Sequence, residues 1–108
     1  MKCWGYNGAG ETDVPPLFDV KAISIGIYHA CALTAEGVRC WGSNDFGQVS
    51  VPELKKPRMI AAGNYHNCAI DDEGVKCWGN RLYGQLKVPP LIQPRVIASG
   101  ELHSCAID

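Results

Sequence analysis

One pattern of residues occurs three times in this chain, and each copy begins 37 residues after the one before it. The triplet Cys-Trp-Gly starts at Cys3, Cys40 and Cys77. A second pattern, His-x-Cys, keeps the same spacing and starts at His29, His66 and His103. A period of roughly 20–50 residues is typical of propellers and solenoids, in which one repeat cannot bury its apolar face without its neighbours. The sequence therefore predicts stacked copies of one unit, and we expect any function to lie on the assembled surface.

Each copy has the pattern of β structure. In the second copy, the apolar runs 66–70 and 75–78 flank a short turn that ends at Gly74, as in a β-hairpin. The small residues Ala61-Ala62-Gly63 precede this hairpin and indicate that neighbouring copies approach closely there. Connections that contain proline, such as Val51-Pro52, separate the copies, because proline cannot donate to a strand ladder.

The expected fold is all-β, since no helical periodicity exceeds about two turns. We expect one domain, residues 1–108, of three propeller-blade-like antiparallel repeats. The repeats span approximately 3–39, 40–76 and 77–108, and residues 1–2 complete the last of them by strand exchange. The tryptophan of each triplet is expected in the core between blades. Each repeated histidine is expected to be structural, with its ring donating to a neighbouring backbone carbonyl.

These residues resemble the repeats of the regulator of chromosome condensation family. The matching positions are Ala61-Ala62-Gly63, His66, Ala69-Ile70, Gly74, Trp78-Gly79 and Gly84-Gln85-Leu86. The resemblance implies a propeller-like scaffold that binds proteins. The chain departs from that family in number, because family members typically close a ring of seven blades. It also has Gly10-Glu11 in place of Gly-Gln, and Arg81 in place of the loop asparagine found at Asn7 and Asn44.

The balance of charge excludes several classes of partner. Lys plus Arg number 10 and Asp plus Glu number 11, which gives a net charge of −1 and no basic surface for nucleic acid. No apolar run is long enough to span a bilayer.

Met1 leads directly into Lys2-Cys3-Trp4, so no signal peptide is expected at this end. An exported protein would have lost that peptide already, or the chain is an excerpt.

All six cysteines lie at two positions of the repeat. Symmetric pairing in the hairpins places Cys31 opposite Cys40 and Cys68 opposite Cys77, close enough for cross-strand disulfides. An even number of cysteines in a small chain rich in glycine and proline favours an oxidising compartment, extracellular or at the cell surface. Reduced core cysteines and a His-Cys metal site are the alternatives. The spacing does not match that of structural zinc, so we expect no metal and no cofactor.

The two ends of the chain are complementary halves of one hairpin. Cys3 and Cys105 occupy the same two repeat positions, and only the three turn residues equivalent to Ala35-Glu36-Gly37 are missing between the halves. Complementary edges that cannot close within one chain pair between chains, so we expect head-to-tail association into a ring or a filament. The residues expected to exchange are Met1, Lys2, Cys3, Trp4, Cys105, Ala106, Ile107 and Asp108. An excised piece of a longer propeller and a self-closed three-fold monomer remain the alternatives.

No catalytic constellation is present, so an enzyme is not expected. The acidic run Asp71-Asp72-Glu73 lies in a hairpin turn and is expected to be solvated. Each His-x-Cys pair lacks a third group that would orient it. Two functions remain: a structural protein that associates with copies of itself, and a secreted binding or inhibitor propeller like those related to this family. In the second case the contacts with another protein would come from Tyr6, Phe46, Arg81 and Tyr83.

Overall fold

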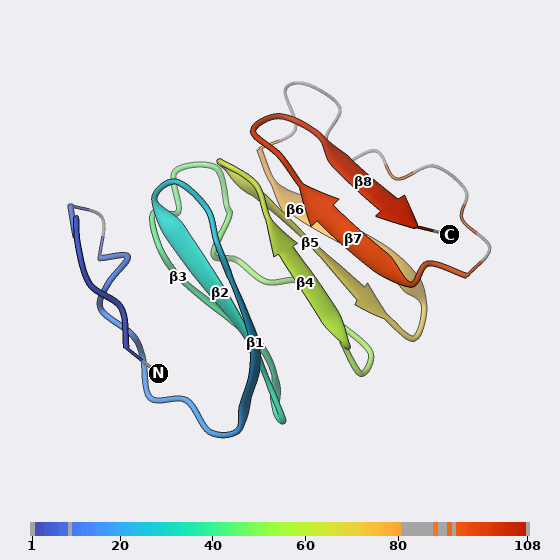
Figure 1. Ribbon diagram of the computed structural model, residues 1–108, viewed down its shortest axis with the longest axis horizontal. Helices are drawn as coiled ribbons and strands as arrows, with labels where there is room; N and C mark the ends of the chain where they lie inside the picture. The colour runs from blue at the N-terminus through green and yellow to red at the C-terminus, as the bar shows by residue number, and fades with distance from the viewer. Residues whose placement is uncertain (1, 9, 81–87, 89–90, 92, 108) are drawn as a thin grey trace.

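Three antiparallel sheets stand side by side in a row (Figure 1). This computed structural model describes residues 2–8, 10–80, 88, 91 and 93–107, and these contain eight strands and no helix. The first sheet has β1 (Val20–Ile25), β2 (His29–Thr34) and β3 (Gly37–Gly42), and the second has β4 (Met59–Ala62), β5 (His66–Asp71) and β6 (Gly74–Gly79). The third has β7 (Val96–Ser99) and β8 (Ser104–Ile107). The prediction of an all-β fold with propeller-like blades is confirmed.

The hairpin register is the same in the first two sheets. His29 lies opposite Gly42 at one end of the first hairpin, and His66 lies opposite Gly79 in the second. At the other end a turn of two residues leads into a glycine with positive φ, 126° at Gly37 and 120° at Gly74. A residue that carries a side chain rarely adopts this left-handed backbone conformation, which explains why glycine ends both turns.

Neighbouring sheets share their cores. Ile60 of β4 packs against Cys31 and Leu33 of β2, in a cluster that also holds Ala69 and Trp78. The middle strands β2 and β5 are buried along their whole length because sheets or loops cover both of their faces. Burial of this apolar surface is the main force that holds one blade against the next.

Glycines allow neighbouring sheets to approach each other closely. A Cβ on Gly26 would lie 2.5 Å from the carbonyl oxygen of Gly63, and a Cβ on Gly63 would lie 2.5 Å from that of Gly100. The predicted close approach of neighbouring copies is therefore present, and it requires residues without a side chain.

The two ends of the described chain lie at opposite ends of the row (Figure 1). Residues 2–8 and 10–19 form no strand, and they lie on the outer side of the first sheet, where Cys3, Val14 and Leu17 pack against buried residues. The described residues do not close into a ring, which is contrary to the self-closed alternative. Met1 and Asp108, which we expected to take part in strand exchange, lie outside the described residues. The described residues contain no helix that is long and apolar enough to cross a membrane.

Candidate functional site

Both complete hairpins carry the disulfide that their register predicts. Cys31 bonds to Cys40 and Cys68 bonds to Cys77, with the Cα atoms of each pair 4.1 and 4.0 Å apart. The equivalent cysteines at the two ends of the chain are free. Cys3 is half-buried at the outer side of the first sheet, and Cys105 is exposed on β8. Cys105 lies opposite Ala98 of β7, so the other edge of β8 has no strand beside it among the described residues.

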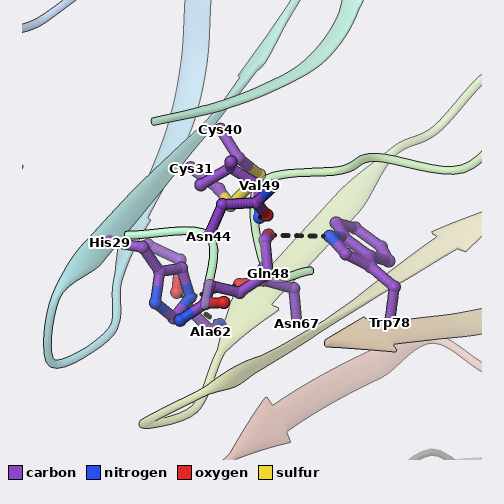
Figure 2. The surroundings of a disulfide bond; sticks show 10 residues. His29, Cys31, Cys40, Asn44, Gln48, Val49, Ala62, Asn67 and Trp78 are labelled. Atoms are coloured by element: carbon purple, nitrogen blue, oxygen red, sulfur yellow. Dashed lines mark hydrogen bonds between the residues drawn. A yellow bond between two sulfur atoms is a disulfide. The ribbon is translucent and has the colours of Figure 1, made fainter. Parts of the chain in front are cut away.

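A buried hydrogen-bond network joins the first sheet to the second (Figure 2). The Asn67 amide nitrogen donates to the backbone carbonyl of Gln48 at 2.6 Å, and its oxygen accepts from Nε2 of His29 at 2.8 Å. The indole of Trp78 donates to the same Gln48 carbonyl at 3.0 Å. The expectation that the ring donates to a backbone carbonyl is wrong for His29, because its partner is a side chain of the next blade.

The second junction repeats the arrangement with a different partner. Nε2 of His66 lies 3.0 Å from the hydroxyl of Ser104, and both histidine bonds join residues that are 38 positions apart. Ser104 also lies 3.2 Å from the hydroxyl of Ser99. Each histidine ring therefore links its own blade to the one that follows it.

Burial disfavours the charged form of both histidine rings. Removal from water lowers the pKa of His29, against the opposing effect of its bond to Asn67, and it also lowers the pKa of His66. The Nδ1 atoms of both rings have no hydrogen-bond partner among the described residues. Within that part of the chain, no group of three or more His, Cys, Asp or Glu residues could hold a metal ion.

Asp71 stabilises the turn of the second hairpin. This buried carboxylate accepts hydrogen bonds from the backbone of Lys55 at 2.8 Å and of Glu73 at 2.9 Å, and Nζ of Lys76 lies 3.2 Å away. Burial alone would raise the pKa of Asp71, but these bonds outweigh it and the pKa is lowered. The expected solvated turn is correct for Asp72 and Glu73, which are exposed, and wrong for Asp71.

We expect stability to fall in two steps as the pH is lowered. The pKa values of His29 and His66 lie below 6.5 in the folded state, so below pH 6.5 the unfolded chain binds protons first and the free energy of unfolding decreases. The pKa of Asp71 lies below 3.8, so a further loss begins below that pH. Urea unfolding at a series of pH values measures both steps. A free energy of unfolding that stays constant from pH 7 to pH 5 would contradict the lowered pKa values of the two buried rings.

The three equivalent tryptophans have two different environments. Trp41 and Trp78 are each only 7% exposed, and their indoles donate to the backbone carbonyls of Glu11 and Gln48, which lie 30 residues earlier. The expectation of a core position is correct for these two. Trp4 is 87% exposed, because no further blade covers it in this structure.

Two residues of the expected binding rim lie in a continuous row of aromatic rings. The ring centres of Tyr6 and Tyr28 are 6.4 Å apart, those of Tyr28 and Tyr65 are 6.3 Å apart, and those of Phe46 and Tyr65 are 5.2 Å apart. Sequence reasoning missed Tyr28 and Tyr65, although a tyrosine directly before the histidine in the first two copies was the available signal. The other two rim residues, Arg81 and Tyr83, lie outside the described residues.

Comparison with known proteins places these features in a family. Residues 20–48 and 60–85 match the family model of the regulator of chromosome condensation (RCC1) repeat. No curated protein shows significant sequence similarity to the chain.

The fold is similar to solved propellers. The CRINKLY WD40 ectodomain of the Arabidopsis thaliana receptor kinase ACR4 is 34% identical over 98% of this chain, with a TM-score of 0.76. The ectodomain of the Physcomitrella patens receptor kinase CR4 is 27% identical over 98%, with a TM-score of 0.79. Yeast RCC1 (Prp20), solved bound to Kap60, shares the fold at 19% identity over 96%, with a TM-score of 0.78. This chain spans only 38%, 32% and 36% of those three chains.

Proposed function

Because this chain belongs to the regulator of chromosome condensation repeat family, we propose that it is a non-enzymatic protein-interaction module whose partner is a second copy of itself. The observation that carries this proposal is the open third sheet. No strand among the described residues pairs with the second edge of its strand β8, and Cys105 on that strand is exposed at the repeat position where Cys31 and Cys68 are disulfide-bonded. In each of the first two sheets, the strand opposite this cysteine is a third strand that carries Cys-Trp-Gly.

The N-terminal triplet of another copy supplies that strand. In the two complete hairpins the triplet glycine lies opposite the repeated histidine and the triplet cysteine lies opposite the repeated cysteine. With the same register, we expect Gly5 of one copy to lie opposite His103 of the next, and Cys3 opposite Cys105. The copies thus associate head to tail, and the added strand covers the free edge of β8.

A disulfide between Cys3 and Cys105 makes the association durable. The two thiols lose two protons and two electrons, the S–S bond forms, and a small-molecule disulfide oxidant is reduced to two thiols. An oxidising compartment supplies that oxidant, so we place the protein outside the cell or at its surface. The two disulfides within the chain support this location, and so do the receptor ectodomains to which the fold is similar.

The geometry of each junction decides the size of the assembly. Two copies would contribute six blades, within the range of about four to eight that is usual for propellers. A ring forms if the rotation at each junction closes after two copies, and a filament forms if it does not. Both assemblies use the same residues at the junction.

Disulfide mapping between labelled copies tests this proposal. Equal amounts of ¹⁴N and ¹⁵N protein, mixed before oxidation, are expected to give a peptide pair joining Cys3 to Cys105, with about half of the pairs carrying one label on each side. Cys3→Ser and Cys105→Ser variants are the controls, and each should lose the linked pair while keeping both internal disulfides. Linked pairs that never mix the labels, or free thiols at both residues after oxidation, would refute head-to-tail linkage.

The aromatic row supports a second candidate function, the binding of a different protein at the rim. Tyr6, Tyr28 and Phe46 are exposed, and the contacts between their rings and Tyr65 hold them in a defined geometry. Aromatic side chains of this kind are enriched in the energetic centres of protein interfaces. A Tyr6→Ser/Phe46→Ser variant would then lose its target and keep its own assembly. Loss of the assembly in that variant would contradict a separate rim function.

A further inference from the structure

The two junctions inside the chain are built in the same way. An isoleucine in the first strand of one blade packs against a cysteine and an aliphatic residue in the middle strand of the blade before it. Ile60 contacts the cluster of Cys31 and Leu33, and the equivalent Ile97 belongs to the cluster of Cys68 and Ile70. As a result only 8% of Ile60 and 5% of Ile97 are exposed. The described chain thus contains two copies of one interface.

The outer side of the first sheet is the incomplete half of a third such interface. Ala32 and Trp41 are buried there, with Cys3, Val14 and Leu17 packed against them. The equivalent residues at the first internal junction are Ala69, Trp78, Cys40, Val51 and Leu54, and all of them belong to the completed core. Ile23, the equivalent of Ile60 and Ile97, is 53% exposed, because no cysteine and aliphatic pair lies in front of it.

The missing half lies at the other end of the chain. Cys105 and Ile107 of β8 occupy the repeat positions of Cys31 and Leu33, and they also occupy those of Cys68 and Ile70. Both are exposed, and Ile107 has 56% of its surface accessible. The first and third sheets lie at opposite ends of the row (Figure 1). The first sheet therefore presents an isoleucine without its partner pair, and the third presents a pair without its isoleucine.

We propose that the outer side of the first sheet is a docking site for the third sheet of a second copy, with Ile23 packed between Cys105 and Ile107. This inference rests on the proposed self-association and adds a non-covalent interface that does not need the Cys3–Cys105 bond. The occupant is a copy of this chain because the site has the pattern of an interface that the chain already forms twice. Cys3 already packs on the first sheet as Cys40 packs at the internal junction, so docking needs little ordering of the N-terminal segment.

This interface is weaker than the two internal ones. At each internal junction a histidine ring bonds to a polar side chain of the following blade, Asn67 or Ser104. The equivalent residue at the docking site is Ala30, which offers no side-chain acceptor to His103. We therefore expect reversible docking, which the disulfide of the oxidised protein then makes permanent.

Sedimentation of variants that lack the linking cysteines tests the docking site. On a Cys3→Ser/Cys105→Ser parent, Ile23→Lys and Ile107→Glu should each weaken self-association about a hundredfold or more, because each buries an unpaired charge. Both side chains are more than half exposed in the single chain, so each variant should unfold at the temperature of the parent. Ala35→Lys, which adds the same charge at an exposed residue of the first hairpin turn, is the control and should associate like the parent.

Mixing the two variants gives the decisive result. An equimolar mixture of Ile23→Lys and Ile107→Glu forms one junction with an opposite-charge pair and one junction of wild-type residues, so association should recover at least about tenfold over either variant alone. A parent that does not self-associate, variants that associate as the parent does, or a mixture without recovery would overturn the docking site. If the true occupant were a repeat of some other chain, the experiment would give these same results. The mixed-label disulfide between wild-type copies tests the proposed function separately, because it does not depend on Ile23.

Discussion

Replacing Trp78 by alanine is expected to lower the free energy of unfolding by about 3–5 kcal/mol, the usual range for removing a large buried aromatic side chain. Trp78 lies in the core shared by the first two sheets, and its indole also donates to the backbone carbonyl of Gln48. The substitution removes apolar contacts with both blades and leaves a cavity at their junction. Urea unfolding followed by circular dichroism measures the loss.

The chain provides a matched control for this substitution. Trp4 holds the same position of the repeat but is 87% exposed, so Trp4→Ala should change the unfolding of the single chain by less than about 0.5 kcal/mol. The measurement is made at a dilution where the protein is monomeric, because Trp4 is part of the strand proposed to exchange. Equal losses for the two variants would mean that Trp4 is buried within the single chain, contrary to the structure.

Replacing Asn67 by alanine is expected to cost about 2–3 kcal/mol. This side chain is buried, accepts a hydrogen bond from His29 and donates one to Gln48 (Figure 2). Without it the imidazole N–H of His29 has no acceptor in an environment that excludes water. The Gln48 carbonyl keeps its bond from Trp78, which limits the loss.

Serine at the same position is the control for Asn67. The second junction already uses serine, because Ser104 bonds to His66 as Asn67 bonds to His29. Asn67→Ser should therefore cost about 1 kcal/mol less than Asn67→Ala, since the histidine keeps a hydroxyl partner. Urea unfolding of both variants at pH 7 checks this order. If serine were no better than alanine, the histidine bond would not contribute to the junction.

Features that lie within one repeat were predictable from the sequence. The spacing of the cysteines and the glycine at the end of each turn determine the hairpin register, because a turn of two residues allows one pairing. The disulfide of Cys31 with Cys40 follows from that register. The buried positions of Trp41 and Trp78 followed in the same way from their repeated place in a strand.

Features that depend on contact between repeats were not predictable. The partner of His29 is 38 residues away in another sheet, and no local pattern indicates whether a side chain or a backbone carbonyl will be there. In the aromatic row, Tyr28 and Tyr65 share one position of the repeat, whereas Phe46 and Tyr6 hold two others. Alignment of the copies therefore does not reveal the row. Asp71 is similar, because its carboxylate accepts a hydrogen bond from the backbone of Lys55, which lies in the connection before its sheet.

The mass of the oxidised whole chain in solution tests the central claim most directly. Light scattering on protein purified without reductant should give a mass that is a multiple of the 11.7 kDa of one chain, and twice that value if the ring closes with two copies. Under the same conditions Cys105→Ser should give a lower mass on dilution, because only the reversible interface remains. A mass of 11.7 kDa for the oxidised wild-type protein at every concentration would contradict head-to-tail association.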